Sequence, residues 1–217
     1  MWEARLQQPG MTPDQLLAHV SDVTTILEDN FFLQSGLAFI RDAYTAAKFA
    51  KQRGAQSVRL CAGTRPDFEM TLDGITQLFE VTEADLPGRT RGKEYRDALG
   101  QPPKLVHVEQ LEMFQNACAI PGALEDRATL KAGKSYDPSW SLVILLNIPT
   151  YGVAIAEVES IMTAATEAAG KAFSEVWVMW NGRLYRPWPA GWNAPPEPAA
   201  DPSDSRGLQA WLDEQGG

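Results

Sequence analysis

The chain has 217 residues, of which 44% are hydrophobic, and it carries a formal net charge of −9. This length and composition allow one domain with a substantial core and argue against global disorder, while the acidity disfavours general affinity for nucleic acid. With only two cysteines and two histidines, the sequence offers no disulfide framework, no zinc-ligand spacing and no histidine-based metallohydrolase site.

The first part of the chain changes from a helical to a strand-like pattern. Residues 12–29 are predicted to be a helix, because Thr12 suits the N-cap, Pro13 suits the first helical position and apolar residues recur at helical spacing. Residues 36–53 predict a second amphipathic helix that Gly54 ends. Three short antiparallel strands are then predicted at residues 57–62, 68–72 and 77–83.

The second part returns to long helical and apolar runs. Residues 108–132 are predicted to be largely helical, with an interruption at Pro121-Gly122. The apolar run at 140–148 is typical of a central strand that is covered on both faces. An Ala-rich helix at 154–172 and a hairpin at 174–185 complete the pattern. This order predicts an α/β fold, with a mixed central β-sheet flanked by helices, N-terminal helices and a C-terminal hairpin.

A change in composition after residue 187 divides the chain. We expect a single α/β domain at 1–187, made of N-terminal helices at 12–54 and a core at 57–187. We expect residues 188–217 to be a Pro-rich tail with a short helix near its end. Two of its tryptophans, Trp188 and Trp192, are expected either to hold the tail against the domain or to contact a protein partner or a second copy of the chain.

Two sequence features bear on the cellular location. The longest apolar stretch, residues 142–148, is too short to cross a bilayer. The first residues, MWEARLQQPG, do not show the charged-then-apolar pattern of a secretion signal. We therefore expect a cytoplasmic protein that does not associate with a membrane.

Acidic residues lie on two neighbouring predicted strands joined by a turn at Asp73-Gly74. Asp67 stands at the start of the first strand and Glu80 lies in the second. Alternation along the second strand places Glu80 on the face opposite Val81 and Glu83. A hard divalent cation needs oxygen ligands that converge from separate elements, and carboxylates on neighbouring strands meet that need.

Pro66-Asp67 followed by Glu80-Val81-Thr82 resembles the motif of the PD-(D/E)xK nuclease superfamily, and LPGRTRGKEY after it resembles a group of uncharacterised bacterial proteins labelled as endonucleases. The resemblance covers roughly residues 58–148. It implies a restriction-endonuclease-like core in which Asp67 and Glu80 hold Mg or Mn and assist hydrolysis of phosphodiester bonds in nucleic acid. The family has a lysine where this chain has Thr82.

A cation from elsewhere has to replace the missing lysine, which orients the attacking water and balances charge in the transition state. In some members of the superfamily the lysine has moved to a neighbouring helix, and Lys93, Lys131 and Lys134 are the candidates here. A purely structural alternative is that lysines near a helix C-terminus interact favourably with the helix dipole.

A local basic turn offers a contact for nucleic acid despite the overall acidity. Arg89 and Arg91 are candidates to clamp a phosphate, and Tyr95 is a candidate hydrogen-bond donor to it. An ordinary salt-bridged loop is the structural alternative. Because of Thr82 and the net negative charge, a second function stays open, that of a catalytically inactive nuclease-like domain acting as a binding or assembly protein.

Overall fold

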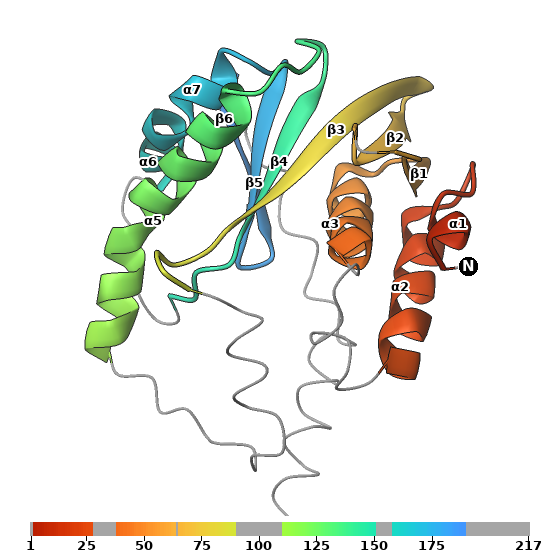
Figure 1. Cartoon of the computed structure of the whole chain (residues 1–217), viewed down its shortest axis with the longest axis horizontal. Helices are drawn as coiled ribbons and strands as arrows, with labels where there is room; N and C mark the ends of the chain where they lie inside the picture. The colour runs from red at the N-terminus through yellow and green to blue at the C-terminus, as the bar shows by residue number, and fades with distance from the viewer. Residues whose placement is uncertain (1, 28–37, 64, 90–109, 151–157, 190–217) are drawn as a thin grey trace, which may run out of the picture.

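A six-stranded mixed β-sheet, with its strands in the order β1-β2-β3-β4-β5-β6, forms the centre of the computed structural model (Figure 1). The structure describes residues 2–27, 38–63, 65–89, 110–150 and 158–189. The strands are β1 (Ser57–Leu60), β2 (Phe68–Leu72), β3 (Ile75–Ala84), β4 (Ser141–Leu146), β5 (Glu175–Trp180) and β6 (Arg183–Trp188). β1, β2 and β3 are antiparallel, β3, β4 and β5 are parallel, and β6 returns antiparallel to β5.

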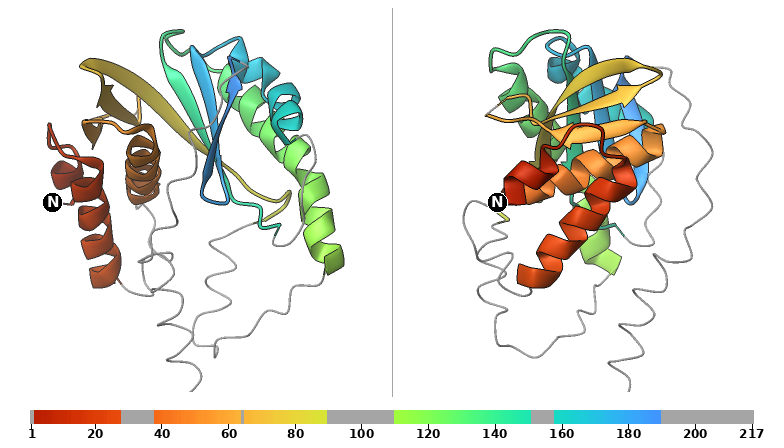
Figure 2. Two further views of the ribbon diagram at one scale, coloured as in Figure 1. Left: turned by 180° about the vertical axis from the view of Figure 1, so that it is seen from behind. Right: turned by 90° about the vertical axis from the view of Figure 1, so that its right-hand side faces the viewer.

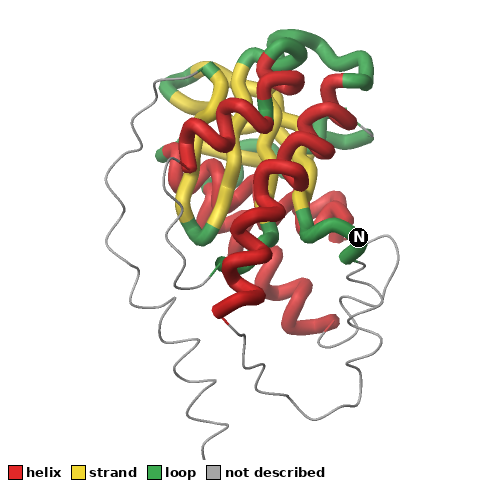
Figure 3. The backbone as a smooth tube through the Cα atoms, turned by 90° about the vertical axis from the view of Figure 1, so that its left-hand side faces the viewer, coloured by secondary structure: helices red, strands yellow, loops and turns green. Residues whose placement is uncertain are grey.

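Helices cover both faces of this sheet (Figures 1 and 2). The N-terminal helices α1 (Trp2–Leu6), α2 (Pro13–Leu27) and α3 (Ala38–Arg53) lie on one side. The other side carries α5 (Gln110–Ala132), α6 (Val158–Ala165) and α7 (Glu167–Gly170), which lie in front of the strands in Figure 3. None of the described helices is long and apolar enough to cross a membrane. The predicted α/β class, with a mixed sheet flanked by helices, is confirmed.

The sheet separates two hydrophobic cores. The first core lies under α2 and α3 and contains Phe49, Phe79 and Trp177. The second core lies under α5, α6 and α7 and contains Leu124, Ile144 and Trp180. Strand β4 contributes alternate residues to both cores, which confirms the prediction of a central strand buried on each face. Trp177 and Trp180 point to opposite faces, as their spacing predicts.

Two hairpin turns were predictable from dipeptides with left-handed backbone preference. Asp73 and Gly74 have φ values of 51° and 77°, and Asn181 and Gly182 have 49° and 75°. Two consecutive positive φ values are the mark of a type I′ turn, which matches the twist of the strands on either side. The hairpins β2–β3 and β5–β6 form as expected, and the second extends to Trp188 at the edge of the sheet.

Two helix predictions need correction. α5 runs without a break from Gln110 to Ala132 with Pro121 inside it, because the packing of its buried face, including Ile120 and Leu124, outweighs the backbone hydrogen bond that proline cannot make. The helix predicted at 154–172 is two helices. Thr166 leaves helical geometry between them, with φ −105° and ψ 10°, and its hydroxyl donates to the carbonyl of Met162. Residues 154–157 and the predicted tail from 190 onward lie outside the described residues.

Candidate functional site

Strand β3 changes partners at Phe79, and the candidate site lies at this change. Residues 75–79 of β3 pair with β2, whereas residues 79–84 pair with β4. Asp67 directly precedes β2 and occupies the point where β2 and β3 separate. Its backbone N–H donates to the carbonyl of Phe79 at 2.9 Å, and its Oδ2 accepts a hydrogen bond from the Val81 N–H at 2.6 Å. Asp67 thereby satisfies a β3 backbone donor that β2 does not reach.

The environment of Asp67 shows that it shares a charged cluster with Glu80. Burial raises the pKa of the Asp67 carboxyl, and the hydrogen bond from Val81 opposes that rise. The negative charge of Glu80 also raises this pKa, while the cations of Lys131 and Arg65 lower it. The two carboxylates singled out in the sequence are therefore brought close enough to influence one another.

Glu80 lies on the face of β3 that α5 covers, opposite Phe79 and Val81, as alternation predicts. Its side chain is buried, and the residue is only 4% exposed. Oε1 accepts hydrogen bonds from Lys131 Nζ at 2.7 Å and from the Tyr136 hydroxyl at 3.0 Å. Oε2 is also buried, and it has no hydrogen-bond partner in the part of the chain that the structure describes.

Lys131 comes from the last turn of α5 and is 8% exposed, so its ammonium is withdrawn from solvent together with Glu80. Lys134 lies beyond the end of α5 and is exposed. Among the three lysines proposed from the sequence, the structure thus brings Lys131 to Glu80 and places Lys134 outside the cluster. Lys93 lies outside the described residues.

Tyr136, in the loop between α5 and β4, was not recognised from the sequence. Burial, and then the negative charge of Glu80, raise the pKa of its phenol well above the ordinary value, so the hydroxyl stays protonated and donates. The ring packs against Phe173 and Trp140, with centroids 5.0 and 6.1 Å away. The guanidinium of the exposed Arg65 lies 4.8 Å from the ring centroid.

Asp42 on α3 adds a third carboxyl that sequence reasoning missed. Burial raises its pKa to about 7, with the charge of Asp67 as the next cause. A signal was present, because Asp42 is the only acidic residue in α3 and shares a helical face with the buried Ala46 and Phe49. Among the described residues, however, no group of three or more Asp, Glu, His or Cys side chains is arranged to hold a metal ion.

The remaining predicted site residues lie elsewhere. Arg89 is exposed beyond the C-terminal end of β3, where its Nη1 donates to the carbonyl of Asn147 at 3.4 Å. Arg91 and Tyr95 lie outside the described residues. Two other acidic residues of these strands, Glu69 and Glu83, form ion pairs with Arg59 and Arg41, at 2.7 and 2.8 Å.

Asp67 and Glu80 are the two carboxylates that would hold a divalent cation if one were bound. The test is Oε2 of Glu80, a buried carboxylate oxygen that has no hydrogen-bond partner among the described residues, since such an oxygen carries a desolvation cost that a cation would relieve. Two protein carboxylates are also a usual complement for magnesium, which keeps several waters and takes further oxygens from phosphate.

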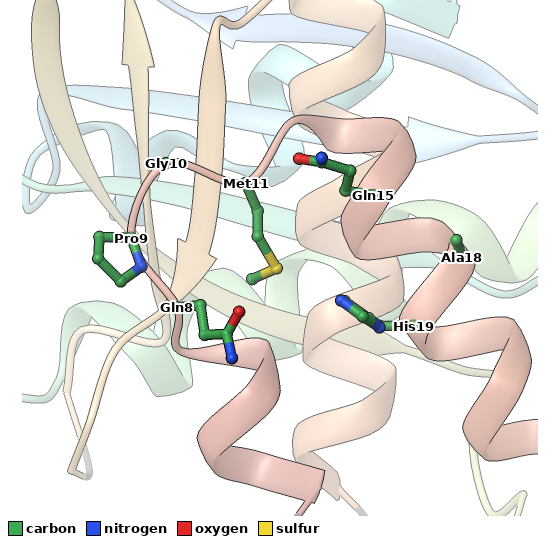
Figure 4. A pocket seen from close by; sticks show the side chains of 7 residues that line it. All are labelled: Gln8, Pro9, Gly10, Met11, Gln15, Ala18 and His19. Carbon is green, nitrogen blue, oxygen red and sulfur yellow. The ribbon is translucent and has the colours of Figure 1, made fainter.

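A separate hollow of about 460 Å³ lies at the connection between α1 and α2 (Figure 4). Gln8, Met11, Gln15 and His19 contribute to its lining, which includes no carboxylate, lysine or arginine. The hollow is therefore a poor match for a metal ion and has no part in the cluster around Glu80.

Comparisons of this chain with protein-family models, with curated proteins and with solved structures give no match. The basis for a functional proposal is therefore the geometry around Glu80.

Proposed function

We propose that this protein is a metal-dependent nuclease with a restriction-endonuclease-like core, and that it hydrolyses phosphodiester bonds in nucleic acid. The observation that carries the proposal is the buried contact of 2.7 Å between Lys131 Nζ and Glu80 Oε1, beside Asp67. The motif that the sequence resembles has a lysine where this chain has Thr82. Lys131 supplies a cation next to the same strand from a neighbouring helix.

The order of elements supports the same proposal. Among the described residues, a helix, three antiparallel strands, a further helix and a strand parallel to the third come in the order α3, β1, β2, β3, α5 and β4. This order is similar to that of the nuclease superfamily. It places the start of β2, the middle of β3 and the end of α5 around one cluster, so each group that the chemistry needs comes from a different element.

In the proposed site, Asp67 and Glu80 would hold Mg or Mn. When bound, such an ion polarises a phosphate oxygen and lowers the pKa of a water molecule. Lys131 fixes Oε1 of Glu80 and provides positive charge where negative charge develops on the phosphoryl group. Because Glu80 and Lys131 are largely shielded from solvent, their electrostatic interactions are stronger than they would be in water.

Arg65 is an exposed cation beside this cluster, since its guanidinium lies against the Tyr136 ring and its charge lowers the pKa of Asp67. It is suited to meet a phosphate that approaches from solvent. A local contact of this kind is what the proposal requires in a chain whose net charge of −9 opposes broad binding to a polyanion.

A calorimetric titration of Mn²⁺ into chelator-treated protein tests the metal site. We expect a single ion per chain in the wild type and loss of binding in Glu80→Gln. Glu69→Gln is the matched control, because Glu69 projects from the same face of the sheet but is paired with Arg59. Equal Mn²⁺ affinity in the wild type and Glu80→Gln would show that Glu80 is not a ligand.

Cleavage assays then test the chemistry. Single- and double-stranded DNA and RNA are incubated with Mg²⁺ or Mn²⁺ and with the wild type, Lys131→Met or Asp67→Asn. Loss of cleavage in both variants, with Glu69→Gln unaffected, is the expected result. Cleavage that persists in Asp67→Asn would remove Asp67 from the mechanism.

One observation favours a second function, that of a catalytically inactive nuclease-like domain which binds or assembles with other molecules. Oε1 of Glu80 is already engaged by Lys131 and Tyr136, so the carboxylate has a neutralising partner without a metal ion. A wild-type protein that binds no Mn²⁺ and cleaves none of the four substrates would favour this function. Pull-down with residues 190–217 deleted, which keeps strand β6 intact, would then test whether that segment contacts a partner.

A further inference from the structure

The two oxygens of Glu80 have different surroundings. Oε1 receives both hydrogen bonds, from Lys131 and Tyr136, and Oε2 is buried without a partner in the described residues. We propose that Tyr136 is a positioning residue that fixes Oε1 of Glu80 and thereby presents Oε2 to a divalent cation. This inference rests on the proposed metal site and deepens it.

Lys131 alone would not determine which of the two Glu80 oxygens stays available to a metal ion. The ammonium of Lys131 has three donors on a flexible stem, so it can bond to either oxygen of a carboxylate or to both. The Tyr136 hydroxyl has a single donor at the end of a rigid ring, and an ionised carboxylate can only accept. When both donors meet at Oε1, at 2.7 and 3.0 Å, the rotation of the Glu80 carboxylate is fixed and Oε2 is left for another ligand.

The ring of Tyr136 is itself held in place. Phe173 and Trp140 pack around it, with centroids 5.0 and 6.1 Å away, and the Arg65 guanidinium lies 4.8 Å from its centroid. These contacts use the ring and leave the hydroxyl to Glu80. A ring fixed by packing carries its hydroxyl to a defined point, which is the kind of outer support that orients metal ligands in proteins.

The variant Tyr136→Phe removes the hydroxyl and keeps the ring, so the packing against Phe173 and Trp140 is preserved. Tyr185→Phe is the matched control, because Tyr185 lies on β6, where its ring is next to Trp180 and not next to Glu80. Mn²⁺ affinity is measured by calorimetry for the wild type and both variants. Circular dichroism and the urea midpoint of each protein establish that it is folded under the titration conditions.

We expect the Kd for Mn²⁺ to rise about 10-fold or more in Tyr136→Phe, which is the usual effect of removing an outer partner of a metal ligand, and to stay unchanged in Tyr185→Phe. If the Tyr136 hydroxyl had only a structural role, removing it would lower the urea midpoint but would not change the Kd of the folded protein for Mn²⁺. Unchanged Mn²⁺ affinity in a folded Tyr136→Phe would overturn the positioning role while leaving the metal site intact. Absence of binding in the wild type would instead reject the metal site, and the positioning role with it.

Discussion

The buried pair formed by Glu80 and Lys131 makes a quantitative prediction about stability. The two side chains are 5% and 10% exposed, so removing either partner leaves the other charge buried without compensation. We expect Lys131→Met or Glu80→Gln alone to lower the free energy of unfolding by about 3 to 5 kcal/mol. The double variant removes both charges, so its loss should be only about 0 to 2 kcal/mol. The resulting coupling energy should exceed about 3 kcal/mol.

Arg59 and Glu69 provide the comparison, because their charged atoms are also 2.7 Å apart while their side chains are 38% and 26% exposed. Solvent screening should reduce their coupling to about 1 kcal/mol or less. Urea denaturation at pH 7, followed by tryptophan fluorescence for the four proteins of each cycle, measures both couplings. Similar coupling energies for the two pairs would refute the reasoning, since the distances are equal and the expected difference comes from burial.

Three further changes have defined outcomes. Burial raises the pKa of Asp42 to about 7, so ionisation of this carboxyl opposes folding as pH rises from about 4 through 7. Asp42→Asn should therefore add roughly 2 to 4 kcal/mol to the free energy of unfolding at pH 8 and little at pH 4. Urea denaturation at both pH values measures the difference. Pro121→Ala should restore a backbone hydrogen bond inside α5 and stabilise the fold by about 1 to 3 kcal/mol, so a lower urea midpoint would contradict the account of that helix. A Cβ on Gly170 would lie 2.6 Å from the Trp188 ring, so Gly170→Ala should lower the free energy of unfolding by about 1 to 3 kcal/mol. Gly122 lies in an open part of α5, so Gly122→Ala should raise the free energy of unfolding by about 0.5 to 1 kcal/mol. Thermal or urea unfolding of both variants checks this contrast.

Local signals made much of the fold predictable. The turns Asp73-Gly74 and Asn181-Gly182 require left-handed backbone that few other dipeptides accept, so both hairpins could be placed from four residues. The apolar run of β4 has no polar face, which predicts burial on both sides. Pro121 shows where a local rule fails, because the packing of a long helix depends on contacts that are far away in sequence.

The candidate site was harder to predict, because its parts are distant along the chain. Asp67 and Glu80 could be selected from strand patterns, but the choice among three lysines depends on how α5 crosses the sheet, and Lys131 is 51 residues from Glu80. The position of Asp42 on the buried face of α3 could be recognised from the sequence, but its link to Asp67 could not. Its pKa depends on burial and on Asp67, which only the packing of α3 brings near. Tyr136 gave no motif at all, since a tyrosine beside a helix end is usually part of a core.

The burial of the Glu80 carboxylate depends on two partners that lie far from it in the sequence. Lys131 and Tyr136 lie 51 and 56 residues farther along the chain, beyond the whole β1–β3 meander. While only the N-terminal helices and this meander are assembled, the Glu80 carboxylate faces water, because α5 and the loop after it supply its cover. Dehydration of this carboxylate and docking of α5 are therefore one event. The energetic cost of withdrawing the Glu80 charge from water therefore falls on the step in which α5 docks, and the ammonium of Lys131 that offsets it arrives on the same helix.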